Sequence, residues 1–538
     1  MKILVVSMLR LGDLIMAAQS LVAIRKIYPD ADIHLLTNRS NLPIAKLING
    51  VTRVHYFERE LCQKSLGEEN RSVFEATDRI DDLIKRLNKY EFDKVINLTQ
   101  NRISAHLSGM VNATEYHGMI TSENNVVHLS SPWFRHLNNY IAGKGTDAFH
   151  YVDLFRSALG FEEKWSEADV FIQPKTRAFS EHKNKIVVQA WSSDEKKDYS
   201  ISNWRKYFTH LASIRPNTEV VVLGAPNERQ RLNSFLKDIG DPGIKIEPAI
   251  LTFEELLDYL PRQSCVVSVD TSIKHLAGAI GMRVIELALG SSDPRKTGVY
   301  SEGSIVIKSR VDCAPCSHIK TCSKASYLCE ESIDPEMLSM VTHEYLRGSW
   351  PSLRVLAEEY RENTYIGRVG FTQSGLWFTQ SLHPVEWQRE KESLVNLESW
   401  RFTLNRKYLE LSPPFQKVAH SLAPTLMDPQ KLMVERLESV SRQTEMNVDR
   451  VARQVHDAVK DLAVGDISDN KEVLRELRAL ESDLGLGDYL SRYVHSISAQ
   501  GISSIRSLRE SINELRNFQV TKTNILRSIH NMNKEEQV

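Results

Sequence analysis

The stretch SVDTSIKHLAGAIG, residues 268–281, decides the fold of this chain. It follows the apolar run Cys265–Val269, which is short enough for a buried strand, and it continues into a helical pattern of small residues. Asp270, Thr271 and Ser272 therefore fall on a strand-to-helix turn. Such a turn offers free backbone N–H groups and the positive end of a helix dipole, which suit a phosphate group. An ordinary helix N-cap is the alternative, because Asp, Thr and Ser are all good caps.

The composition limits the class of protein. A chain of 538 residues is too long for one hydrophobic core, so two to four domains are expected. The net charge of −1 argues against nucleic acid as the main partner. The first apolar run, Ile3–Val6, is too brief for a signal peptide, and no run approaches the roughly 18 apolar residues of a membrane helix. We expect a cytoplasmic protein with at most peripheral contact with the inner membrane.

The amino-terminal half alternates short apolar runs with helical patterns. This alternation predicts parallel βαβ units and a doubly wound α/β sheet, in which ligands bind beyond the carboxyl ends of the strands. Asp13 lies just past the first predicted strand, Lys2–Ser7, and before the predicted helix Leu14–Ile27. A carboxylate there could accept a proton from a hydroxyl group. A helix N-cap is the alternative role for Asp13.

A second strand-first pattern begins at Lys185–Ala190, after the polar stretch 173–184. The loop that follows contains a cation, Lys197, and two hydroxyls, Ser192 and Ser193, which together can hold a pyrophosphate. A solvated charged loop is the alternative interpretation of this segment. Lys196, instead of Lys197, could also be the lysine that binds the phosphate. Glu228 follows another predicted strand, where a carboxylate can accept a sugar hydroxyl, although a surface Glu at a helix start would have the same pattern.

Together these segments resemble glycosyltransferase family 9, the ADP-heptose heptosyltransferase group. DTSIKHLA at 270–277 is similar to the family's D-T-G-x-x-H-L-A, and RLGD at 10–13 is similar to R-x-G-D. GAPNE at 224–228 and GSSDPRKTG at 290–298 resemble G-A-P-x-E and G-x-T-x-P-x-x-T-G. Lys197 takes the Lys of K-x-W-P, but Tyr199 and Ser200 replace the Trp and Pro. Ser272 stands where Gly is usual, so we expect it to crowd the phosphate or to demand a backbone angle that Ser dislikes.

The resemblance implies a GT-B fold of two facing Rossmann-like domains, with an acceptor-side domain at 1–172, a linker at 173–184 and a donor-nucleotide domain at 185–348. It also implies an inverting glycosyltransferase that moves a sugar, heptose, from an ADP-heptose-like donor to a lipopolysaccharide-core or protein hydroxyl, without a catalytic metal. In that reading Asp13 is the catalytic base and Glu228 binds the ribose. The other implied donor-binding residues are Ser192, Ser193, Lys197, Asp270, Thr271, Ser272 and His275.

Four cysteines cluster near the end of the second pattern. Cys313, Cys316, Cys322 and Cys329 begin with a C-x-x-C spacing and could form a tetrahedral structural site. Zinc is the usual choice by ligand softness. The resemblance makes iron its rival, because some family members that heptosylate proteins carry an iron-bearing cysteine finger here. Reduced or disulfide-paired thiols on a surface loop are the alternative.

The resemblance ends near residue 345, and residues 349–538 form an extension. Residues 365–382 read as a β-hairpin, and apolar residues at heptad-like spacing in 448–462 and 505–515 predict helices. These helices fit homo-oligomerisation, docking to an acceptor-bearing partner, or a small intramolecular bundle. A non-catalytic GT-B-fold scaffold protein that acts through this tail is the alternative to an enzyme.

Overall fold

The computed structural model describes residues 1–62, 73–121, 127–141, 149–161, 170–171, 184–317, 319–372, 374–405 and 517–526. The predicted linker lies outside these residues except for Asn184. Both heptad-like segments, 448–462 and 505–515, also lie outside them.

The first sheet is built from the amino-terminal part of the chain and has the order β3-β2-β1-β4-β5-β6 in the described residues. Its central strand β1 pairs in parallel with both neighbours, so Val5 lies opposite Leu35 on one side and Ile96 on the other. Only the edge strand β6 is antiparallel. The strands are β1 (Lys2–Ser7), β2 (Asp32–Asn38), β3 (Arg53–Phe57), β4 (Phe92–Asn97), β5 (Ala113–Thr121) and β6 (Val127–Leu129).

The second sheet has the order β14-β13-β12-β11-β10-β7-β8-β9. The strands from β12 to β9 run parallel, with β10 between β11 and β7. They are β7 (Lys185–Gln189), β8 (Glu219–Gly224), β9 (Lys245–Ile250), β10 (Cys265–Val269), β11 (Val284–Ala288) and β12 (Ile305–Ser309). Both faces are buried, because Val187 packs in one core cluster while its neighbours Ile186 and Val188 pack in another. The predicted α/β class with two doubly wound sheets is confirmed.

The predicted hairpin exists, as β13 (Thr364–Phe371) and β14 (Trp377–Ser381). It does not stand apart in an extension, because β13 pairs antiparallel with β12 and so enlarges the second sheet. Pairing with β12 satisfies backbone groups that would otherwise form an open edge.

Helices cover both sheets and connect their strands. Those of the first unit are α1 (Leu11–Ile27), α2 (Leu42–Ala45), α4 (Val73–Asn88), α5 (Arg102–Met110), α6 (Pro132–Ile141) and α7 (Tyr151–Ala158). Those of the second are α8 (Ile201–Ile214), α9 (Arg229–Ile239), α10 (Phe253–Tyr259), α11 (Ser272–Ala279), α12 (Pro294–Thr297), α13 (Leu328–Glu331), α14 (Pro335–Arg347) and α15 (Trp350–Glu359). Short 3-10 turns lie at Arg39–Asn41, Glu195–Lys197, Pro226–Glu228 and Leu260–Arg262.

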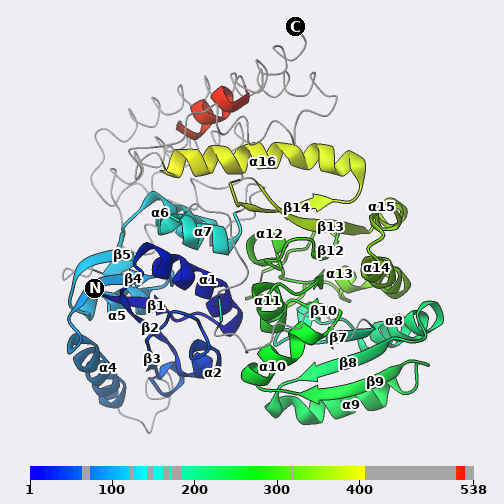
Figure 1. The fold of residues 1–538 in the computed structure, drawn as a ribbon, viewed down its shortest axis with the longest axis horizontal. Coiled ribbons are helices and arrows are strands. Elements are labelled where there is room, and N and C mark those ends of the chain that lie inside the picture. Colours follow the sequence, from blue (N-terminus) through cyan, green and yellow to red (C-terminus); the bar gives the residue numbers. More distant parts are fainter. Residues whose placement is uncertain are drawn as a thin grey trace.

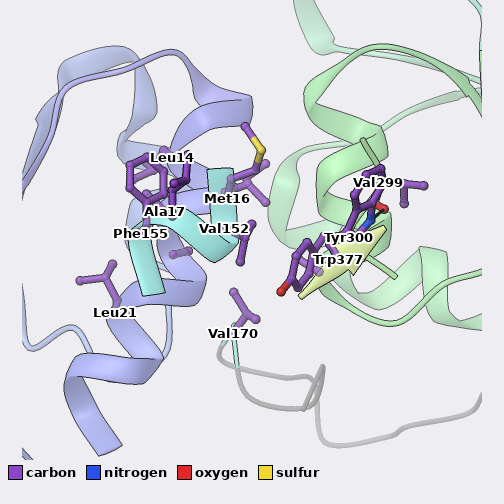
Figure 2. Packing of buried hydrophobic residues seen from close by; sticks show 14 of the residues in the cluster. Leu14, Met16, Ala17, Leu21, Val152, Phe155, Val170, Val299, Tyr300 and Trp377 are labelled. Carbon is purple, nitrogen blue, oxygen red and sulfur yellow. Dashed lines mark hydrogen bonds between the residues drawn. The ribbon is translucent and has the colours of Figure 1, made fainter. Parts of the chain in front are cut away.

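The two units lie side by side, with α1 and α11 between the sheets (Figure 1). Figure 2 shows the apolar contact between them, where α1 and α7 face Val299, Tyr300 and Trp377 of the second unit. These side chains belong to one continuous buried cluster. This buried contact therefore joins the two units and stabilises their close approach.

A long helix, α16 (Pro384–Asn405), runs across the top of both units (Figure 1). Its Trp400 stacks on Phe518, with ring centroids 4.2 Å apart, and also contacts His136 of α6. The carboxyl-terminal part thus packs back onto the first unit. Among the described residues, every helix is too short or too polar to cross a lipid bilayer.

Candidate active site

The turn after β10 has the local structure expected from its sequence. Thr271 is the N-cap of α11, and its hydroxyl accepts a hydrogen bond from the Ile273 N–H at 3.2 Å. Ser272 begins the helix, and in the described chain Glu91 is the one residue other than glycine with positive φ. The expected backbone strain at Ser272 is therefore wrong, because a helical first turn suits any residue. Capping by Thr271 still leaves other N–H groups of the first turn to face a ligand.

Lys197 lies beside this turn, and its Nζ donates to Asp270 Oδ2 at 2.7 Å. Lys196, its rival, points elsewhere and donates to the carbonyls of Ser317 and Lys320 at 2.9 and 2.8 Å. Gly290 makes this arrangement possible, because a Cβ there would lie 2.2 Å from the Lys196 carbonyl oxygen. The structure therefore brings Lys197, and not Lys196, to the Asp270 turn.

Asp270 is buried and has two cationic neighbours. Burial opposes its ionisation, but the charges of Lys274 and Lys197 outweigh this effect and hold its pKa well below the usual range. His275 lies 3.9 Å from Asp270 through Nε2. Burial, and then the Lys274 charge, lowers the pKa of His275 well below its usual value, so its imidazole is neutral near pH 7.

Asp13 occupies the third position of α1, whose N-cap is Arg10. The N-cap interpretation of Asp13 is therefore wrong. The pKa of Asp13 is raised from 3.8 to about 6, and burial is the largest cause. Arg10 opposes this rise, and the charges of Asp270 and Lys197 raise and lower the pKa by smaller amounts. A carboxylate that titrates near neutrality can accept a proton at working pH. The charges of Asp270 and Lys197 act on the Asp13 carboxyl, so Asp13 lies near the Asp270 turn although it belongs to the other unit.

Glu228 is held in place at the end of β8. Its Oε1 accepts from the Trp191 indole N–H at 3.0 Å, and its Oε2 accepts from the Ala225 N–H at 2.8 Å. The carboxylate is partly exposed, so it can accept a further hydrogen bond from a ligand. Sequence reasoning missed Trp191 as the residue that orients it.

The two predicted hydroxyls differ in their surroundings. Ser192 is engaged in a local turn, because its Oγ donates to the Asp194 carbonyl at 2.8 Å and its N–H donates to Asp198 at 2.6 Å. Ser193 is exposed. In the described residues Lys197 donates to Asp270 and Ser192 bonds within its own turn, so the donor-binding role of both hydroxyls stays a prediction.

The four clustered cysteines are free thiols, and Cys329 is buried. Burial raises the pKa of Cys329, and its neighbours Cys316 and Cys313 raise it further. In the described parts of the chain, no group of three or more His, Cys, Asp or Glu side chains is arranged to hold a metal ion. Zinc or iron binding at Cys313, Cys316, Cys322 and Cys329 stays a prediction from the sequence.

Sequence reasoning also missed a fully buried charge beside the site. Lys274 has a fully buried side chain and donates to Asp270, to Glu286 and to the Thr297 carbonyl. The signal was present: Lys274 lies four residues after Asp270 on one helical face, and Glu286 interrupts the apolar run of β11. A lone lysine and a lone glutamate in apolar patterns predict a buried ion pair only when they are considered together.

The chain matches one protein-family description. Residues 80–327 match glycosyltransferase family 9 (heptosyltransferase). The matched part includes Lys197, Glu228 and the Asp270 turn, whereas Asp13 precedes it. A search of curated protein sequences finds no significant match to the chain.

Several solved structures are similar to it. The Escherichia coli heptosyltransferase WaaC with ADP is 19% identical, with 56% of this chain and 91% of that chain covered and a TM-score of 0.42. A family 9 glycosyltransferase from Veillonella parvula is 15% identical, with 65% and 97% covered and a TM-score of 0.47. The Escherichia coli ADP-heptose lipopolysaccharide heptosyltransferase II is 15% identical, with 65% and 99% covered and a TM-score of 0.45. This match identifies residues 80–327 as a domain of glycosyltransferase family 9, the heptosyltransferase family.

Proposed function

We propose that this glycosyltransferase transfers heptose from ADP-heptose to a hydroxyl acceptor and inverts the configuration at the anomeric carbon. The observation that carries the proposal is the ion pair between Lys197 and Asp270 at the start of α11, with the carboxylate of Asp13 coupled to it from the other unit. One unit thus supplies the cation for a leaving diphosphate, and the other supplies a proton acceptor.

The chemistry follows from these two parts. The acceptor hydroxyl attacks the anomeric carbon from the face opposite the diphosphate and gives its proton to Asp13, while the bond from the anomeric carbon to the phosphate oxygen breaks. Negative charge grows on the leaving ADP as this bond breaks. Lys197 and the free N–H groups of the first turn of α11 stabilise that charge. Glu228 binds a ribose hydroxyl and so fixes the nucleotide.

The acceptor is a hydroxyl of the lipopolysaccharide core or of a protein. The adenine nucleotide and the heptose are supported by the family match and by the sequence motifs at 224–228 and 270–277.

The donor site is tested by calorimetric titration with ADP-heptose, ADP, UDP-glucose and GDP-mannose. We expect binding of the adenine nucleotides alone. Lys197→Ala should weaken ADP binding by about 10-fold to 100-fold, because it removes a hydrogen bond between charged groups. Lys237→Ala, an exposed position on α9, is the matched control and should leave the affinity unchanged. Equal binding of UDP-glucose would contradict the adenine specificity.

The transfer itself is tested by ADP release in the presence of lipopolysaccharide core or protein acceptors. Proton NMR of the product then reports the configuration at the new glycosidic bond. Retention of the donor's configuration would exclude the direct displacement proposed here.

A further inference from the structure

Lys274 is the centre of a buried charge network behind the Asp270 turn. Its Nζ lies 2.5 Å from Asp270 Oδ1, 2.8 Å from Glu286 Oε1 and 2.8 Å from the Thr297 carbonyl oxygen. An ammonium group has three N–H donors, so all of its hydrogen-bonding capacity is used. The other oxygen of Glu286 accepts from the Val299 N–H at 2.7 Å, an arrangement that suits a carboxylate.

This network connects the two loops beside the proposed diphosphate site. Asp270 belongs to the turn before α11, and Thr297 and Val299 end the loop that begins at Gly290. The same loop is tied to the first unit, because His150 Nε2 donates to the Gly298 carbonyl at 2.9 Å. Lys274 therefore links the turn at Asp270 to the loop that contains Thr297.

The two cations on Asp270 differ in their freedom to move. The Lys274 side chain is 0% exposed and bound on three sides, whereas the Lys197 side chain is 19% exposed and is paired with Asp270 alone in the contacts described. Burying a carboxylate without a counter-ion is very costly. If Lys197 were the sole partner of Asp270, moving it toward another anion would carry that cost.

We propose that Lys274 is a positioning residue that serves as the fixed counter-ion of Asp270 and thereby frees Lys197 to bind the diphosphate. This inference rests on the proposed function for the identity of the anion. It adds that the binding of the diphosphate by Lys197 depends on Lys274, a residue that does not itself contact the ligand.

Lys274→Met alone leaves two buried carboxylates with one cation fewer, so it is expected to destabilise the fold. Lys274→Met/Glu286→Gln removes one positive and one negative charge and keeps an acceptor for the Val299 N–H. We expect this double variant to fold like wild type in thermal unfolding. A purely structural role for Lys274 predicts that the double variant also recovers wild-type ADP binding. The proposal predicts that the double variant still binds ADP weakly. Without Lys274, Asp270 keeps Lys197 as its counter-ion, and Lys197 is then not free to bind the diphosphate.

The test is a mutant cycle measured by ADP calorimetry. We expect Lys274→Met/Glu286→Gln to bind ADP about 10-fold more weakly than wild type, and we expect Lys197→Ala to add less than about 2-fold on that background. The proposal would be overturned if Lys197→Ala weakened ADP binding by the same factor in the double variant as in wild type. Wild-type ADP affinity in the double variant would also overturn it. Lys237→Met is the matched control at an exposed lysine.

A second measurement needs no ligand. Acetylation of Lys197 by an N-hydroxysuccinimide ester, followed by mass spectrometry, should be about 5-fold slower in the double variant, because Asp270 holds the amine more tightly. An equal rate would overturn the proposal even if wild type bound no ADP. Absence of ADP binding by wild type, with slower acetylation in the variant, would instead reject the proposed function and keep the role of Lys274.

Discussion

The backbone of Gly12 lies directly against the imidazole of His275, so that a Cβ on Gly12 would be 2.9 Å from His275 Cδ2. The same Cβ would be 3.8 Å from the Cα of Ser272. Gly12 belongs to α1 of the first unit, and the other two residues belong to α11 of the second. The missing side chain lets the amino-terminal ends of the two helices approach each other. This approach brings Asp13 within electrostatic range of Lys197 and Asp270.

Gly12→Ala should therefore reduce transfer without unfolding the protein. Alanine suits a helix better than glycine by about 1 kcal/mol, which offsets part of the strain. The new methyl group must displace His275 or separate the helices, and a shift of a few tenths of an ångström at reacting groups should lower the turnover by about 10-fold. ADP release measures the turnover, and calorimetry with ADP is the control, because the donor residues stay in the second unit. Unchanged turnover would show that the close approach is not required.

The fold was predictable from local patterns, but the connections between distant segments were not. Alternating apolar runs predicted both parallel sheets, and the turn at Asp270 was predicted from Cys265–Val269 and the small residues that follow. The pairing of β13 with β12 joins segments that are far apart in the sequence, and strand composition alone does not specify a partner.

In the candidate site, too, local features were predictable from the sequence and contacts between distant residues were not. Lys196 and Lys197 are adjacent and chemically equal, so only the three-dimensional structure reveals which one faces Asp270. Lys274 was missed because its partner Glu286 lies on the next strand, where two separate apolar patterns meet. Local sequence predicts a turn that suits phosphate, whereas the charge balance behind it depends on tertiary contacts.

Asp13→Asn should abolish most of the transfer while leaving donor binding intact. A general base contributes about 10²–10⁴ to a rate, so we expect a loss of that size in kcat. Wild-type kcat/KM should fall as the pH drops below about 6, because burial raises the pKa of Asp13 to that value and only the ionised carboxylate accepts a proton. The pH profile of ADP release checks both statements. A profile that stays flat between pH 5 and 7 would contradict the role of Asp13.

The same substitution should stabilise the fold. The pKa of Asp13 is 3.8 in the unfolded chain and about 6 in the folded protein, so between these values the folded state retains a proton that the unfolded state has lost. The free energy of unfolding therefore falls as the pH rises through this window and stays lower above it. Asp13→Asn removes this loss, so its melting temperature should exceed that of wild type more at pH 7.5 than at pH 5. Asp30→Asn, an exposed position, is the control and should show no such trend.

The contact between the units also depends on a buried polar network. Tyr300 donates to Asp153 Oδ1 at 2.6 Å and accepts from Arg156 at 2.9 Å, and the Trp377 N–H donates to Asp153 Oδ2 at 2.8 Å. Asp153 and Arg156 belong to α7 of the first unit, whereas Tyr300 and Trp377 belong to the second. The network therefore stabilises the apolar contact of Figure 2 and fixes its orientation.

Tyr300→Phe should weaken this contact, because it removes one hydroxyl that serves both Asp153 and Arg156 in a buried place. We expect the free energy of unfolding to fall by about 1–3 kcal/mol, the usual cost of removing one partner from a buried hydrogen bond. Urea unfolding followed by tryptophan fluorescence measures the change. Tyr56→Phe, at an exposed tyrosine, is the matched control and should change the stability little. Because burial holds the pKa of Tyr300 well above its usual value, the hydroxyl stays protonated, and the loss should be the same at pH 7 and pH 9. A loss that disappeared at pH 9 would show that the hydroxyl does not act as a neutral donor to Asp153.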